Sequence, residues 1–117
     1  MFDTTPVDMY FDIEGEIPLN LVSHNPETEE HVTSYVLDWN SGQGGGIFTE
    51  VYVYEDGHVE VVDEDAGFDL QTIDTDEYPS LSAVAELVIR HNWEEAQGCV
   101  VHVIDKARHD ELMKDWE

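Results

Sequence analysis

Acidic side chains are the residues whose type and spacing in this sequence suggest a chemistry. Alternate side chains on one face of a β-strand repeat every ~6.7 Å, about the spacing of successive phosphates along a DNA backbone. A row of carboxylates can therefore occupy phosphate-binding positions on a basic protein. Asp12, Glu14 and Glu16 would form one such row, and Asp63 with Asp65 another. The full set of candidates is Asp12, Glu14, Glu16, Glu27, Glu29, Glu30, Glu60, Asp63, Asp65, Asp69, Asp74, Asp76 and Glu77.

The distribution of charge is as unusual as its amount. The chain carries 28 acidic and four basic residues, a formal net charge of -24. Residues 1–89 hold 21 of the acids and no Lys or Arg, so this part has no strong cation to pair with. A disordered acidic tail would explain the charge, but 41% of the residues are hydrophobic, including 14 Val. The chain is expected to fold and to hold its charges in place despite their repulsion.

Metal binding is the first alternative use of these residues. The histidines include no pair spaced four residues apart and no His-Glu-x-x-His motif, the spacings typical of zinc sites. The stretch from Asp63 to Asp74 has the length of a calcium loop, but Phe68 stands where that loop needs glycine and Asp74 where it needs a bidentate glutamate. We therefore predict no specific metal site. The histidines are His24, His31, His58, His91, His102 and His109.

Catalysis lacks a recognisable motif as well. The glycine-rich segment 41–46 precedes an expected strand, whereas dinucleotide-binding and phosphate-binding loops open a helix. Neither a serine nucleophile elbow nor an activated-cysteine signature is present. The single cysteine, Cys99, lies in an apolar run typical of a core. The sequence thus predicts a protein that is not an enzyme and needs no cofactor.

A β-hairpin is the best-defined element that positions these carboxylates. Two runs typical of strands, 47–54 and 58–62, flank Asp56-Gly57, a dipeptide typical of hairpin turns. Because strand side chains alternate, one face should bury against a core while the other stays amphipathic. The expected inward residues are Ile47, Thr49, Val51 and Val53, and the outward residues are Phe48, Glu50, Tyr52 and Tyr54.

The remaining elements predict a single α+β domain spanning residues 1–117. Strands are expected at 7–13, 19–22 and 68–73, and a strand buried on both faces at 99–104. Helices are expected at 26–40, with a strand as the alternative, at 81–91 after a cap at Ser80, and after Asp105. We predict a mostly antiparallel sheet of about 4–6 strands with two or three helices.

By its length, its charge and its lack of catalytic motifs, the chain resembles the bacterial DNA-mimic proteins, and among them most closely the small ones that bind the histone-like HU protein. The resemblance implies that the carboxylates stand for DNA phosphates and compete with DNA for HU, which would modulate nucleoid packing. Nucleic acid itself would be repelled. Since no membrane-spanning run is present, we expect a cytoplasmic monomer that binds a basic DNA-binding protein. Interface aromatics are candidates at Tyr10, Tyr52, Tyr54 and Trp93, with core packing as the alternative.

Two other functions would also explain the large number of acidic residues. An inhibitor or immunity protein for a cationic nuclease or defence enzyme would present a carboxylate face to a different target. A domain from a halophile would carry its acids for solubility in high salt. The sequence contains only five Ala and many large aromatic residues, which favours a binding function over the halophile interpretation.

Overall fold

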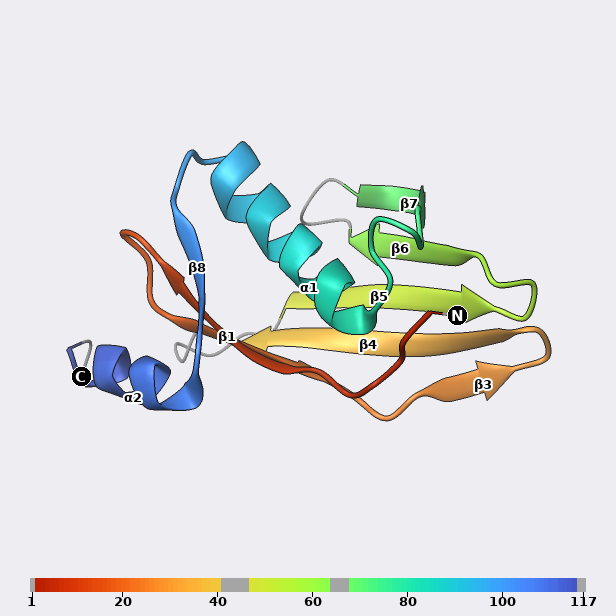
Figure 1. Cartoon of the computed structure of the whole chain (residues 1–117), viewed down its shortest axis with the longest axis horizontal. Helices are drawn as coiled ribbons and strands as arrows, with labels where there is room; N and C mark the ends of the chain where they lie inside the picture. The colour runs from red at the N-terminus through yellow and green to blue at the C-terminus, as the bar shows by residue number, and fades with distance from the viewer. Residues whose placement is uncertain (1, 41–46, 64–67, 116–117) are drawn as a thin grey trace.

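The computed structural model describes residues 2–40, 47–63 and 68–115, and in them one antiparallel sheet curves around a helix (Figure 1). The strand order is β7-β6-β5-β4-β2-β1-β8, and the short β3 pairs with β4 beside this path. Neither α1 nor α2 has the length and apolar character of a membrane-spanning helix. The elements are β1 (Asp8–Ile13), β2 (Leu19–Ser23), β3 (Glu27–Glu29), β4 (Val32–Asn40), β5 (Ile47–Tyr54), β6 (Val59–Asp63), β7 (Phe68–Ile73), α1 (Leu81–Arg90), the π-helical turn η1 (His91–Glu95), β8 (Val101–Ile104) and α2 (Lys106–Lys114).

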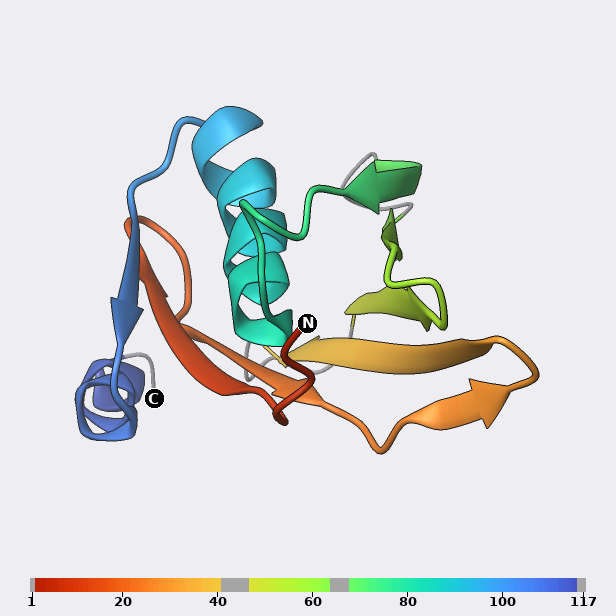
Figure 2. The ribbon, with the colours of Figure 1, turned by 45° about the vertical axis from the view of Figure 1, so that its right-hand side comes forward.

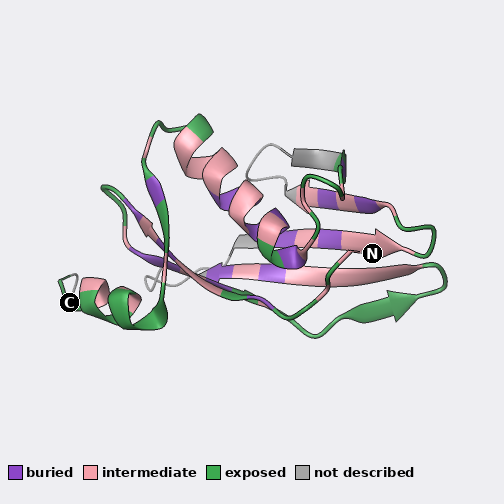
Figure 3. Ribbon diagram, in the orientation of Figure 1, coloured by how far each residue is buried: buried purple, intermediate pink, exposed green. Residues whose placement is uncertain are grey.

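Helix α1 fills the concave face of the sheet, as expected from its apolar stripe. Figure 2 shows the sheet curving around α1 from β8 on one side to β7 on the other. The Ser80 side chain caps the helix by accepting a hydrogen bond from the Ala83 backbone N–H at 3.1 Å. The buried residues lie mainly on the inner faces of the strands and on the sheet-facing side of α1 (Figure 3). The apolar stripe of α1 consists of Leu81, Val84, Ala85, Val88 and Ile89.

The predicted hairpin is confirmed as β5 and β6, an antiparallel pair joined by a tight turn. Gly57 has a φ of +98°, a left-handed conformation that favours glycine, and the Asp56 carboxylate accepts the His58 backbone N–H at 3.0 Å. Val51 pairs with Val61 on the inner face, and Tyr52 pairs with Glu60 on the outer face. The alternation of side chains therefore separates an apolar inner face from a polar outer face.

The predicted helix at 26–40 is wrong, because this segment forms β3 and β4 as a second hairpin. The apolar residues satisfy both a helical and a period-two pattern, and the strand pairing decides between them. β4 pairs with β5 on one side and with β2 and β3 on the other, and it buries Leu37 and Trp39 at 0% and 3% exposure. Glu30, expected in the first helical turn, lies in the β3–β4 turn with a φ of +26°.

The predicted central strand at 99–104 is also wrong in its position, because β8 is an edge strand whose one partner among the described strands is β1. Val101 alone in this strand is fully buried, whereas Val100 and Val103 are 46% and 48% exposed. An uninterrupted apolar run is typical of a strand that is covered on both faces. Helix α1 contacts only one end of β8, so the rest of the strand stays exposed. The Arg90 guanidinium contacts that end, donating to the Val101 carbonyl at 3.2 Å. Within the described residues the sheet has eight strands, more than predicted, with two α-helices.

Candidate functional site

The outer face of β3 to β6 brings carboxylates and tyrosines together. Directly opposite residues of an antiparallel pair point to the same side of a sheet. The pairings of Glu27 with Ser34, of Ser34 with Tyr52 and of Tyr52 with Glu60 therefore make one row across four strands. A second row contains Glu29, Val32 and Tyr54. We call this surface the carboxylate–tyrosine face, defined as Glu27, Glu29, Glu50, Tyr52, Tyr54 and Glu60.

Hydrogen bonds from the tyrosines hold two of these carboxylates. The Tyr52 hydroxyl donates to Glu50 Oε2 on the same strand, and Tyr54 hydrogen-bonds with Glu60 on the next strand. The bond to Glu50 raises the pKa of Tyr52 to about 12, because ionisation would remove the donor and set a phenolate beside a carboxylate. The hydrogen bond to Glu60 likewise raises the pKa of Tyr54. Both phenols thus stay protonated at neutral pH and keep the carboxylates in one position.

His58 completes one end of the face. Its ring stacks on Tyr54, with ring centroids 4.0 Å apart and planes 9° from parallel, and its Nε2 lies 3.5 Å from Glu60 Oε1. Its Nδ1 contacts the Asp56 carboxylate, and hydrogen bonds from the His58 backbone and ring lower the pKa of Asp56. Glu60 is consequently only 17% exposed, whereas Glu27 and Glu29 are exposed. The carboxylates of this face that are most accessible to a partner are therefore Glu27 and Glu29 of β3.

Tyr52 should be the last tyrosine of this face to ionise. Its folded pKa of about 12 exceeds the ordinary 10.0, so its contribution to stability is complete below pH 10 and is lost as the pH rises from about 10 to about 12. Phenolate absorbance, followed together with circular dichroism, measures this. Glu50→Gln should lower the pKa of Tyr52, and Tyr52→Phe should remove the late step. A Tyr52 pKa unchanged by Glu50→Gln would contradict the assigned hydrogen bond.

Positive charge lies at the opposite end of the molecule. In Figure 1 the β3–β4 and β5–β6 turns lie at one end of the long axis, and α2 lies at the other. Two cations of α2 are paired locally, Lys106 with Asp110 at 2.9 Å and Arg108 with Glu111 at 3.0 Å. Arg90 at the end of α1 pairs with Glu86 at 2.8 Å. The carboxylate–tyrosine face therefore has no Lys or Arg among its members or in the strands that carry it.

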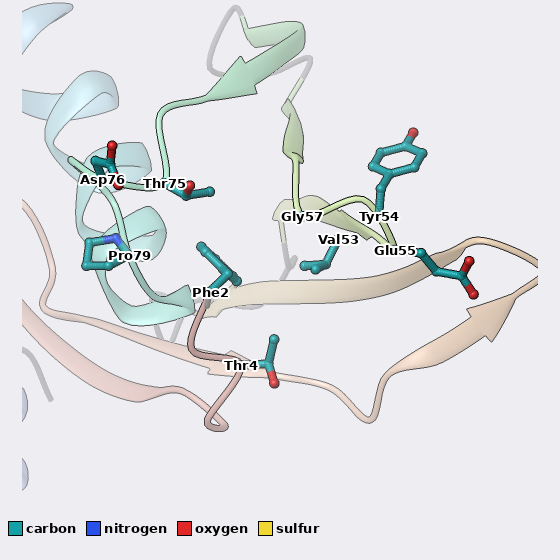
Figure 4. Close-up of a pocket in the computed structure, with 9 residues that line it drawn as sticks. All are labelled: Phe2, Thr4, Val53, Tyr54, Glu55, Gly57, Thr75, Asp76 and Pro79. Atoms are coloured by element: carbon teal, nitrogen blue, oxygen red, sulfur yellow. The ribbon is translucent and has the colours of Figure 1, made fainter.

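Two groups of acidic residues meet at the turn end, and a third lies across a cavity from them. The His31 carbonyl accepts the Glu55 backbone N–H at 3.0 Å, and His31 Nδ1 lies 3.0 Å from Glu55 Oε2, so the β3–β4 and β5–β6 turns are in contact. Glu55 and Asp76 line the same cavity, with the β7–α1 loop on the opposite side of it from the β5–β6 turn (Figure 4). The acids of these three segments are Glu30, Glu55, Asp56, Asp74, Asp76 and Glu77.

The structure divides the sequence-predicted carboxylates between the two ends. Glu27, Glu29 and Glu60 belong to the carboxylate–tyrosine face, and Glu30 lies in the β3–β4 turn at its end. Asp74, Asp76 and Glu77 lie in the β7–α1 loop on the inner side of the sheet, where Asp76 lines the cavity and Glu77 lines a pocket together with Arg90. Asp12 points outward from β1 at the other end. The side chains of Asp63 in β6 and Asp69 in β7 lie outside the described residues, as does the whole of Asp65.

The expected row of Asp12, Glu14 and Glu16 is not a strand row. β1 ends at Ile13, and Glu14 and Glu16 lie in the turn that leads to β2. Glu14 Oε1 lies 3.8 Å from His102 Nε2 on the neighbouring edge strand. The spacing of alternate strand residues therefore does not apply to this group.

Sequence reasoning left Glu50, Glu55 and Asp56 out of the candidate set. Their signal was the hairpin itself, since the Asp56-Gly57 turn sets the register that places Tyr52 opposite Glu60. Among the candidate aromatics, Trp93 packs edge-on against buried Trp39 with centroids 5.3 Å apart, so it contributes to the core.

Tyr10 lies on the outer face of β1, where its ring centroid is 4.8 Å from that of His109 in α2. It therefore helps to hold α2 on the sheet and lies away from the carboxylate–tyrosine face.

The described part of the chain contains no group of three or more His, Cys, Asp or Glu side chains arranged to hold a metal ion. The carboxylate–tyrosine face instead offers fixed negative charges and flat aromatic rings, which suit a large cationic surface. In comparisons with known proteins, no protein-family model matches this chain, and neither the curated proteins nor the solved structures gave a match.

Proposed function

We propose that this protein is a DNA mimic, whose carboxylate–tyrosine face occupies the DNA-binding surface of a basic protein of the histone-like HU type and modulates its binding to DNA. One observation carries the proposal. Carboxylates from β3, β5 and β6 share a surface without Lys or Arg, the Tyr52 hydroxyl holds Glu50 in place, and His58 Nε2 lies 3.5 Å from Glu60 Oε1. A fixed array of negative charge resembles a phosphate backbone more than flexible acidic side chains do.

The dimensions of the face support this function. Glu27 and Glu29 are two residues apart on β3, hence ~6.7 Å apart along the strand, and Glu27 and Glu60 are three strands apart, hence ~14 Å across the sheet. The charges thus extend in two directions, as they do on the two strands of a duplex. Because the tyrosine-held carboxylates are already ordered, binding loses less side-chain entropy than it would with free glutamates.

A competition assay tests the proposal directly. Purified HU is bound to a short fluorescent DNA duplex, and the protein is added while fluorescence anisotropy reports the release of the DNA. We expect full displacement, and we expect it to weaken steeply as salt rises, because phosphate-type contacts are electrostatic. Disordered polyglutamate at equal carboxylate concentration is the control and should need at least about ten times more material, since its charges are not preorganised.

Failure to displace DNA from HU, with the protein folded by circular dichroism, would contradict the proposal for this target. The same spectra distinguish DNA mimicry from the halophile interpretation, which requires a chain that is unfolded at ~0.1 M salt and folds only in molar salt. We expect the protein to be folded at ~0.1 M, because its buried core spans the sheet and α1. Displacement of a cationic nuclease from its substrate, without an effect on HU, would instead favour the inhibitor function.

A further inference from the structure

A cavity of about 610 Å³ opens between the N-terminal segment, the β5–β6 hairpin and the β7–α1 loop (Figure 4). Phe2 reaches into the space between Val53 on one side and Thr75 with Pro79 on the other. Its volume lies within the ~300–1,000 Å³ typical of ligand pockets, and its walls are largely apolar, as such sites usually are.

The position of Phe2 depends on contacts of the neighbouring residues with the β7–α1 loop. The Asp3 backbone N–H donates to the Pro79 carbonyl at 2.8 Å, and the Leu81 N–H donates to the Asp3 carbonyl at 2.9 Å. The carboxylate of Asp3 also accepts the Thr5 backbone N–H at 2.9 Å. The segment is therefore tied to the start of α1, which makes Phe2 a fixed wall of the cavity.

The mouth of the cavity is acidic. Glu55 and Asp76 line it but turn their side chains away from Phe2, so their charges lie at the rim and leave the interior apolar. Asp56 and Asp74 lie beside them in the same two segments, and no Lys or Arg occurs in any segment that lines the cavity. The ligand chemistry that fits is an apolar group flanked by positive charge.

The cavity lies on the inner side of the sheet, where Val53 points into it, and it meets the carboxylate–tyrosine face at the end of β5, where the Tyr54 side chain points away from the cavity (Figure 4). Its neighbour Glu55 links the two surfaces through the turn. A partner segment that passes from the face around the β5–β6 turn therefore reaches the cavity mouth. Interfaces of this kind place a few well-packed side chains in pockets at their centre and leave charged residues at the rim.

We propose that this cavity receives an apolar side chain from a basic segment of the protein partner, flanked by Lys or Arg that meet the rim carboxylates. The inference rests on the proposed function, and it adds a source of specificity that charge alone lacks. Complementary charge is common to many basic proteins, whereas an apolar side chain at the right place between cations is not.

Two short labelled peptides of equal charge test the inference with the full-length protein. One is Lys-Lys-Phe-Lys-Lys and the other is Lys-Lys-Ser-Lys-Lys, with binding followed by anisotropy. The phenylalanine peptide should bind at least about tenfold more tightly, the lower bound for burying such a side chain. The substitution Thr75→Trp, which fills the cavity, should bring the two affinities together at that of the serine peptide. His102→Trp, on the exposed edge strand β8 away from the cavity and the face, is the control and should keep the difference.

Neutralising the rim carboxylates separates the contribution of charge to peptide affinity from the contribution of the cavity. Glu55→Gln with Asp76→Asn should weaken both peptides by the same factor and leave their ratio unchanged. Equal affinities of the two peptides for the unmodified protein would overturn the cavity inference, while displacement of DNA from HU would still support the proposed function. Binding of neither peptide would overturn the cavity inference as well, and failed displacement in the same preparation would overturn both. A difference that survives Thr75→Trp, with the variant folded by circular dichroism, would also overturn the assignment to this cavity.

Discussion

Replacing Leu37 by alanine is expected to lower the free energy of unfolding by about 2–5 kcal/mol, the usual effect of truncating a fully buried leucine. Leu37 is 0% exposed and lies on the inner face of β4, between Ser23 of β2 and Thr49 of β5. Native domains are stable by about 5–15 kcal/mol, so this loss is a large fraction of the total stability. Urea denaturation followed by circular dichroism measures the change.

The neighbouring Val36 is the matched control. It lies on the outer face of the same strand and is only partly buried, so Val36→Ala should lower the free energy of unfolding by less than about 1 kcal/mol. A helix at 26–40 would give the opposite ranking, because Val36 would lie on its apolar stripe together with Val32, Tyr35 and Trp39. A larger loss for Val36→Ala than for Leu37→Ala would therefore contradict the strand.

Reversing the charge of Glu27 and Glu29 to lysine should weaken competition with DNA for HU by between about fourfold and several hundredfold. The double variant changes the local charge by four, and each exposed ion pair contributes roughly 0.2–1 kcal/mol. The remaining binding should depend less on salt, since fewer charges take part. The fold should be kept, and thermal unfolding should occur at the same or a higher temperature, because repulsion among the acids decreases.

Reversal of Glu14 and Glu16 changes the net charge equally at the other end of the molecule. If the carboxylate–tyrosine face is the binding surface, this control should weaken competition by only a few-fold, through the reduced net charge. Equal losses in the two variants would show that total charge, not the face, governs binding. A larger loss for the Glu14 and Glu16 variant would move the binding surface to the β1–β2 turn.

The local signals in the sequence were reliable where a turn or cap defines the element. Asp56-Gly57 predicted the β5–β6 hairpin, and Ser80 marked the start of α1. Each depends on the chemistry of a few consecutive residues, namely the left-handed glycine and the side chain that caps a backbone N–H. The nearness of Tyr52 to Glu60 follows from that hairpin, so one part of the candidate face was available from the sequence.

The helix predicted at 26–40 was wrong for a physical reason. Asn25, Pro26 and the early glutamates provide the signals of a helix start, and the apolar spacing fits both periods. Long-range pairing with β2 and β5 stabilises the strand, and no local pattern contains that contribution. The prediction for β8 was wrong in a different way. Its apolar run predicted burial on both faces, but the strand lies at the edge of the sheet, where it is only partly covered.

The sequence alone determined the charge of this protein, the absence of strong cations before Arg90, the mixed α+β class and the hairpin register that sets Tyr52 beside Glu60. Only the tertiary structure decided which acids lie together. It joined β3 to the hairpin through β4, brought Glu55 and Asp76 to one cavity and left Asp12 at the far end. Charges spread along a chain gather on one surface only through contacts between strands distant in sequence, and those contacts depend on the burial of the whole core.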